Sequence, residues 1–158
     1  MNQRAVRIAI LAVAIMMTPG CVALLATHAA VAVVGTAVYG DPVATADPTA
    51  DLGAVRSIYV KRLYSDSRGV NVLIAEKLTA RGYVVTTGPE KPVGVDAIVT
   101  YADQWKWELW WQMTHLVITI RDPATDYPLV SGSSLNFAGF SPEDLVDRIL
   151  SAMLKKAN

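Results

Sequence analysis

The chain has 158 residues, with 14 lysines and arginines against 14 aspartates and glutamates, and 53% of its residues are hydrophobic. No basic cluster is present that would neutralise a run of phosphates, so the composition excludes a nucleic-acid-binding protein. The single cysteine excludes an internal disulfide, so an apolar core must stabilise the folded part.

The first 20 residues have the pattern of a secretion signal. Arg4 and Arg7 precede an uninterrupted apolar run over residues 8–17, and Pro19 then breaks a helix. This run is shorter than the roughly 20 apolar residues that a membrane-spanning helix needs. We therefore expect residues 1–20 to direct export and then to be removed.

Cys21 follows this segment directly, at the place where bacterial lipoproteins carry their lipid. Residues 18–21 read Thr-Pro-Gly-Cys and resemble the lipoprotein recognition box, whose last two positions they match. The resemblance implies lipidation at Cys21. Two alternatives remain open, namely an uncleaved apolar segment with a buried thiol and cleavage by the ordinary signal peptidase at residues 30–32.

Residues 21–39 form a second apolar segment, rich in alanine, valine, glycine and threonine. We expect this lipidated tail to lie in the membrane interface or to insert partly. A packed helix pair through small residues, and a helical hairpin with the preceding segment, are the alternatives. Residues 40–54 gain prolines and aspartates, a composition typical of a solvated linker, and the globular domain is expected over residues 55–158.

The domain is predicted to begin with a strand, a helix and a second strand. β-Branched and aromatic residues dominate residues 57–64. A helix with apolar positions three and four residues apart follows, with Asp66 or Ser67 as its N-terminal cap and Gly82 as its left-handed C-terminal cap. Residues 83–87 form the next strand, parallel to the first in a right-handed crossover.

Three further strands and a second helix complete the predicted domain. Apolar and polar residues alternate over residues 96–109 and 113–121, which indicates two strands. A turn at residues 122–126 leads to a third strand over residues 129–137. Ser141 precedes a proline and two acidic residues, the pattern of a helix start.

These elements predict an α+β fold in the order β-α-β-β-β-β-α. We expect a two-layer sandwich, in which a mixed, mostly antiparallel sheet of about five strands carries two helices on one face. A signal and a cysteine followed by such a domain resemble the small proteobacterial envelope lipoproteins of unknown function, with a domain similar to the TolB N-terminal, curli-secretion and LptE-type lipoprotein domains. The resemblance implies a periplasmic domain anchored in the outer membrane. The inner membrane is the less favoured location.

Few residues suit catalysis or metal binding. His115 lies within a predicted strand, and no glycine-flanked serine is present to form a nucleophile elbow. The acidic residues and histidines do not have ligand spacing. We therefore predict no catalytic residue, no metal site and no cofactor.

All four tryptophans are close together in the sequence, at Trp105, Trp107, Trp110 and Trp111. The spacing of Trp105 and Trp107 favours a place in the core beneath the helices. Neighbouring residues of a strand point to opposite sides, so Trp110 or Trp111 is expected to be exposed, where it suits a protein partner or lipid headgroups.

The sequence therefore predicts a non-catalytic, membrane-anchored envelope lipoprotein. We expect it to act as a structural or assembly module through contacts with an envelope protein, at the tryptophans or at a sheet edge, and to reach the membrane through its lipid and apolar tail. The alternative is a domain that binds a small ligand or lipid in a pocket between sheet and helices, lined by Trp107, Leu116 and Ile149.

Overall fold

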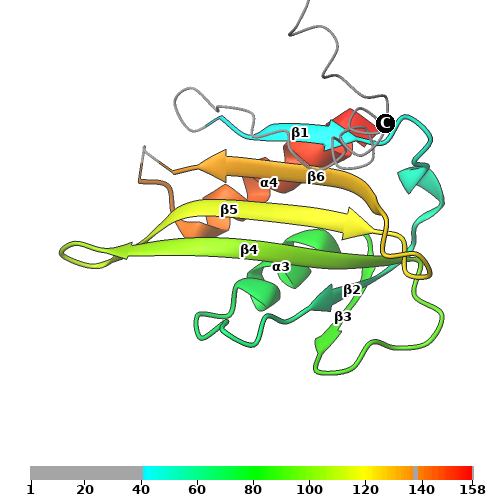
Figure 1. The fold of residues 1–158 in the computed structure, drawn as a ribbon, viewed down its shortest axis with the longest axis horizontal. Helices are drawn as coiled ribbons and strands as arrows, with labels where there is room; N and C mark the ends of the chain where they lie inside the picture. The colour runs from blue at the N-terminus through cyan, green and yellow to red at the C-terminus, as the bar shows by residue number, and fades with distance from the viewer. Residues whose placement is uncertain (1–40, 137–138, 158) are drawn as a thin grey trace, which may run out of the picture. The chain divides into compact units, whose positions relative to one another are not determined.

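The computed structural model describes residues 41–136 and 139–157 (Figure 1). The predicted signal and the apolar tail with Cys21 lie outside these residues. In chain order the elements are β1 (Val43–Ala46), the 3₁₀ helix η2 (Leu52–Ala54), β2 (Ser57–Lys61), α3 (Val70–Thr79), β3 (Val84–Gly88), β4 (Ala97–Trp107), β5 (Trp111–Arg121), β6 (Pro128–Leu135) and α4 (Pro142–Ala157).

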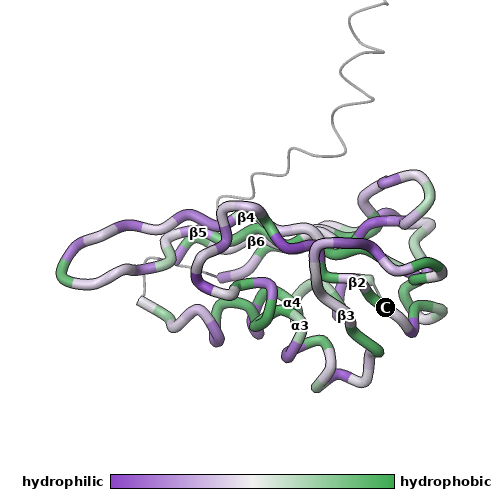
Figure 2. Tube along the Cα trace, turned by 90° about the horizontal axis from the view of Figure 1, so that it is seen from below, coloured by the Kyte–Doolittle hydropathy of each residue, from purple (hydrophilic) through white to green (hydrophobic). Residues whose placement is uncertain are grey.

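All six strands belong to one mixed sheet in the order β1-β6-β5-β4-β2-β3. Strand β2 is parallel to both of its neighbours, β3 and β4, whereas β4, β5, β6 and β1 pair antiparallel in turn. Helices α3 and α4 lie together on one side of the sheet (Figure 2). The predicted α+β class, the mixed sheet and the parallel crossover around the first helix are confirmed.

The sheet has one strand more than predicted, because part of the expected linker over residues 40–54 is folded. Strand β1 pairs with β6 along its whole length. Ala44 and Ala46 pack against the core, and Leu52 is buried in it. Four residues with small side chains carry too little hydrophobic pattern to predict a strand. The folded part therefore starts before residue 55, and its strand order begins with β1.

Helix α3 begins later than predicted. Its N-terminal cap is Gly69, with a φ of +72°, and not Asp66 or Ser67. The C-terminal end is as predicted. Gly82 has a φ of +94°, which glycine adopts at little cost, and the N–H of the next residue donates a hydrogen bond to the carbonyl of Leu78.

The core fills the space between the sheet and the two helices. Its larger side chains are fully buried and come from both layers, among them Ile58, Ile74, Leu78, Leu116, Ile118, Ile120, Leu145, Ile149 and Met153. Burial of each such side chain contributes about 1.5–3 kcal/mol. Helix α4 approaches the sheet closely over Gly132 of β6, where a Cβ atom would lie only 2.5 Å from Cγ of Met153. Glycine in this strand therefore serves the contact with the helix.

Candidate interaction surface

Strands β4 and β5 extend past both helices and form a projecting hairpin (Figures 1 and 2). Trp107 pairs with Trp111 at its end, and the three residues Glu108, Leu109 and Trp110 connect the strands. We call residues 105–113 the tryptophan hairpin, since they contain every tryptophan of the chain.

A β-bulge sets the direction of the side chains in the tryptophan hairpin. Gln104 lies opposite His115, whereas the next residue, Trp105, lies opposite Met113, so Thr114 is the extra residue. The bulge brings Met113 to the helix-facing side, where it is buried in the core. The pair Trp107 and Trp111, two residues further along, therefore points to the same side.

The tryptophans are more exposed than the sequence indicates. Trp105 is partly buried against the core, as predicted. Trp107 is 58% exposed, so its predicted place in the core is wrong: neither helix continues beneath the hairpin end. Trp110 and Trp111 are 58% and 54% exposed, which confirms the predicted exposure, and Leu109, directly before Trp110, is 81% exposed.

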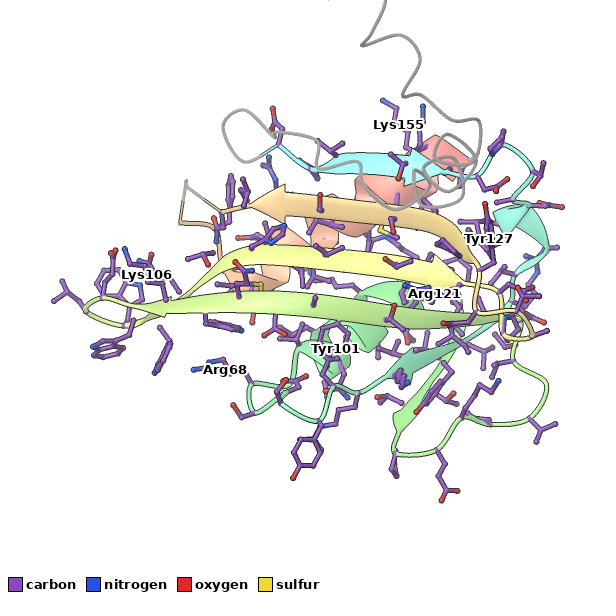
Figure 3. All side chains as sticks on the ribbon, viewed as in Figure 1. Arg68, Tyr101, Lys106, Arg121, Tyr127 and Lys155 are labelled. Carbon is purple, nitrogen blue, oxygen red and sulfur yellow. The ribbon has the colours of Figure 1, made fainter. Side chains whose placement is uncertain are left out.

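Arg68, from the loop between β2 and α3, lies against the tryptophan hairpin. Its Cζ atom is 4.7 Å from the ring centroid of Trp105 and 4.5 Å from that of Trp111. The rings of Trp107 and Trp111 are 5.8 Å apart at 55°. Figure 3 places Arg68 and Lys106 at this end of the domain. Arg68 is far from the tryptophans in sequence, and no local pattern predicts the contact.

Asp66 holds the loop that carries Arg68. Its carboxylate is 4% exposed and accepts hydrogen bonds from the Tyr101 hydroxyl at 2.6 Å and from the backbone N–H groups of Arg68, Gly69 and Asn71 at 2.8–3.0 Å. The sequence predicts Asp66 or Ser67 only as the N-terminal cap of the helix. The structure instead makes it the acceptor that organises the whole loop.

Burial raises the pKa of Asp66, but the hydrogen bonds from Tyr101 and from the backbone outweigh it, so the net pKa lies below the ordinary value. Burial and the hydrogen bond to Asp66 raise the pKa of Tyr101 above its usual range. Both shifts move the pKa values of the two groups further from neutral pH. This pair therefore stabilises structure and is not suited to proton transfer near pH 7.

The structure also places the other residues that were considered for catalysis, metal binding or a pocket. His115 is partly buried within β5, opposite Gln104. Among residues 41–136 and 139–157, no three histidine, cysteine or acidic side chains are arranged to hold a metal ion. Of the residues expected to line a pocket, Leu116 and Ile149 belong to the packed core and Trp107 is more than half exposed.

The structure does describe a hollow elsewhere. It is open, has a volume of about 330 Å³, and lies between residues 91–95 and the turn at Pro123 and Ala124.

Within the described part of the chain, no helix combines the length and the hydropathy needed to cross a bilayer.

Comparisons with known proteins give evidence about the fold only. No protein-family model and no curated protein sequence matches the chain. Two solved PelC dodecamers from Paraburkholderia phytofirmans are similar in structure. One is 14% identical with a TM-score of 0.55, and 72% of this chain covers 97% of it. The other, a single-residue variant, is 16% identical with a TM-score of 0.52, and the same share covers 95% of it.

A PDZ domain protein from Parabacteroides distasonis is 11% identical, with a TM-score of 0.48, and the match covers 72% of this chain and 34% of that one. Almost the whole of each PelC chain is covered by part of this chain, and at these identities the two structures establish the fold alone.

Proposed function

We propose that the chain is a non-catalytic lipoprotein of the bacterial envelope, anchored at the periplasmic face of the outer membrane through Cys21 and residues 21–39. In this proposal it acts as a structural or assembly module through protein–protein contacts. One observation carries the proposed orientation: the tryptophan hairpin projects from the end of the sheet at which β1 begins.

Strand pairing puts the start of β1 and the tryptophan hairpin at the same end of the sheet. Val43, the first residue of β1, lies opposite Ser133 of β6, which lies opposite Val117 of β5, which lies opposite Ala102 of β4. Since the strands alternate in direction, the chain before Val43 leaves the sheet in the direction in which β4 continues. Beyond Ala102, β4 extends by five more residues, or about 17 Å, into the hairpin.

An anchor at this end suits the chemistry of the hairpin. Indole rings combine an apolar body with one N–H donor and gather at the boundary between bilayer and water. Exposed Lys61, Arg62 and Arg68 lie on the neighbouring β2 end and loop, where positive charge is attracted to anionic lipids. We infer that the tryptophan hairpin rests on the bilayer surface.

If the hairpin contacts the membrane, the edges of the sheet are the surfaces proposed for protein contacts. Its edge strands are β1 and β3, and edge strands offer backbone groups that can pair with another chain. The two similar solved structures are described as dodecamers, so copies of this chain are included among the proposed partners.

The anchor is tested by mass spectrometry of the intact protein after its extraction from native membranes with detergent. We expect a chain that lacks residues 1–20 and carries a diacylglyceryl group on the Cys21 sulfur with an acyl chain on its amine. The variant Cys21→Ser should retain its leader and gain no lipid. A wild-type chain with a bare thiol and an intact leader would refute the anchor.

The same preparation tests the protein contacts. Cross-linking in the membrane before extraction should yield species that contain more than one chain, either copies of this protein or a recurrent envelope partner. A chain that remains monomeric and without a partner under these conditions would refute the assembly role while leaving the anchor intact.

A further inference from the structure

We propose that Arg68, which packs against Trp105 and Trp111, binds the phosphate of a membrane phospholipid. This inference rests on the proposed function only in that it needs the tryptophan hairpin to lie on the bilayer. It assigns a ligand-binding site to a residue that neither the sequence pattern nor the core explains.

The guanidinium of Arg68 is available for a ligand. Its backbone N–H donates to Asp66, but none of the residues that the structure describes accepts a hydrogen bond or forms an ion pair with the side chain. The side chain is exposed, and its described contacts are the two indole rings at 4.5 and 4.7 Å. A stacked guanidinium keeps its N–H groups in its own plane, free to donate at the edge.

The site is also pre-formed. The two indole rings restrict the side chain, and Asp66 fixes the backbone of the loop through the N–H groups of residues 68, 69 and 71. A donor that is already ordered loses less conformational entropy when it binds. The planar fork of arginine matches two oxygens of a phosphate or carboxylate, which favours an anionic oxygen ligand.

The surroundings favour a lipid phosphate over a soluble anion. Leu109 and Trp110 extend the hairpin past Arg68 as an exposed apolar tip, which would enter the interface just below the phosphates. Lys106 is already paired with Glu108, their charged atoms 2.6 Å apart, so the hairpin itself adds no second unpaired cation. Arg68 is therefore the unpaired cation that lies directly against the hairpin, where it would meet a headgroup when the tip inserts.

The test uses the full lipidated chain, reconstituted into vesicles of two neutral lipids that differ in phosphate. One is phosphatidylcholine and the other is glucosyl diacylglycerol, which has none. Neither lipid gives the surface a net charge, so general attraction of cations is removed. Since all four tryptophans lie in the hairpin, protection of tryptophan fluorescence from aqueous acrylamide measures the docked fraction.

We expect Arg68→Gln to lower the docking equilibrium roughly tenfold on phosphatidylcholine and to have no effect on glucosyl diacylglycerol. Arg68→Lys keeps the charge but loses the fork, and should also dock more weakly on phosphatidylcholine. Lys155→Gln, which removes an exposed positive charge from the end of the domain opposite the hairpin (Figure 3), is the matched control and should dock like the wild type.

The outcomes separate the two proposals. If the wild type is protected on both lipids and Arg68→Gln behaves identically, the phosphate site is refuted while the membrane contact stands. If the wild type is unprotected on every vesicle, the membrane contact itself fails. A saturable change in fluorescence on adding inorganic phosphate in a phosphate-free detergent, with no difference between the vesicles, would assign Arg68 to a soluble anion and overturn the lipid assignment.

Discussion

Replacing Asp66 with alanine is expected to lower the free energy of unfolding by about 2–4 kcal/mol. The substitution removes the acceptor of four hydrogen bonds at a position that is almost fully buried. The hydroxyl of Tyr101 and three backbone N–H groups would then lack a partner. Chemical denaturation monitored by circular dichroism measures the change.

Asp122→Ala is the matched control for this prediction. The Asp122 carboxylate also accepts backbone hydrogen bonds, from Ala124 and Thr125, but it lies in an exposed turn. Because water can replace its contacts, this variant should unfold almost like the wild type. Equal destabilisation by both substitutions would mean that loss of charge, and not burial, decides the effect.

The contribution of Asp66 also predicts a pH dependence. Its pKa in the folded state is lower than the ordinary value of 3.8, so the folded chain binds this proton less readily than the unfolded chain. The stabilisation is therefore fully present above pH 3.8 and is lost as the pH falls through the lowered pKa. The difference in stability between the wild type and Asp66→Asn should stay constant near neutral pH and shrink in acid.

Replacing both Trp107 and Trp111 with serine is expected to weaken membrane contact far more than folding. Both rings are more than half exposed; they contact each other, and Trp111 also contacts Arg68. We expect the free energy of unfolding to fall by only about 1 kcal/mol. Removing two indoles from the interface should lower the docking equilibrium roughly tenfold or more.

A photoactivatable phosphatidylcholine measures this contact as the yield of lipid cross-linked to the tryptophan hairpin. Leu116→Ala is the complementary variant, because Leu116 is fully buried in the same strand. It should lose about 2–5 kcal/mol of stability and, under conditions where it remains folded, cross-link like the wild type. If the double tryptophan variant loses stability and cross-linking to the same degree, the hairpin is a structural element and not a contact surface.

Local patterns in the sequence predict the elements whose side chains repeat regularly. Alternation locates β4 and β5, and the serine, proline and acidic residues before α4 locate its start. Gly82 is predicted as a left-handed cap because glycine alone adopts that backbone conformation easily. The strand β1 is missed since its alternating alanines are too small to produce a hydrophobic pattern.

The candidate site is only half visible in the sequence. The density of tryptophans marks the hairpin, and alternation gives the correct side of β4 for Trp107. Alternation does not reveal where the helices end, so it predicts burial for a ring that has no helix beneath it. The contacts of Arg68 with the indoles, and of Asp66 with Tyr101, join segments distant in sequence and depend on the finished sheet.

The proposed orientation of the domain is tested most directly by quenching with brominated phospholipids. The full chain is reconstituted into vesicles whose lipids carry bromine either close to the headgroup or near the bilayer centre, and the intrinsic fluorescence reports the tryptophan hairpin alone. Bromine close to the headgroup should quench strongly, and bromine near the centre weakly. Emission that neither lipid reduces would place the tryptophans away from the membrane and contradict the proposed function of this surface.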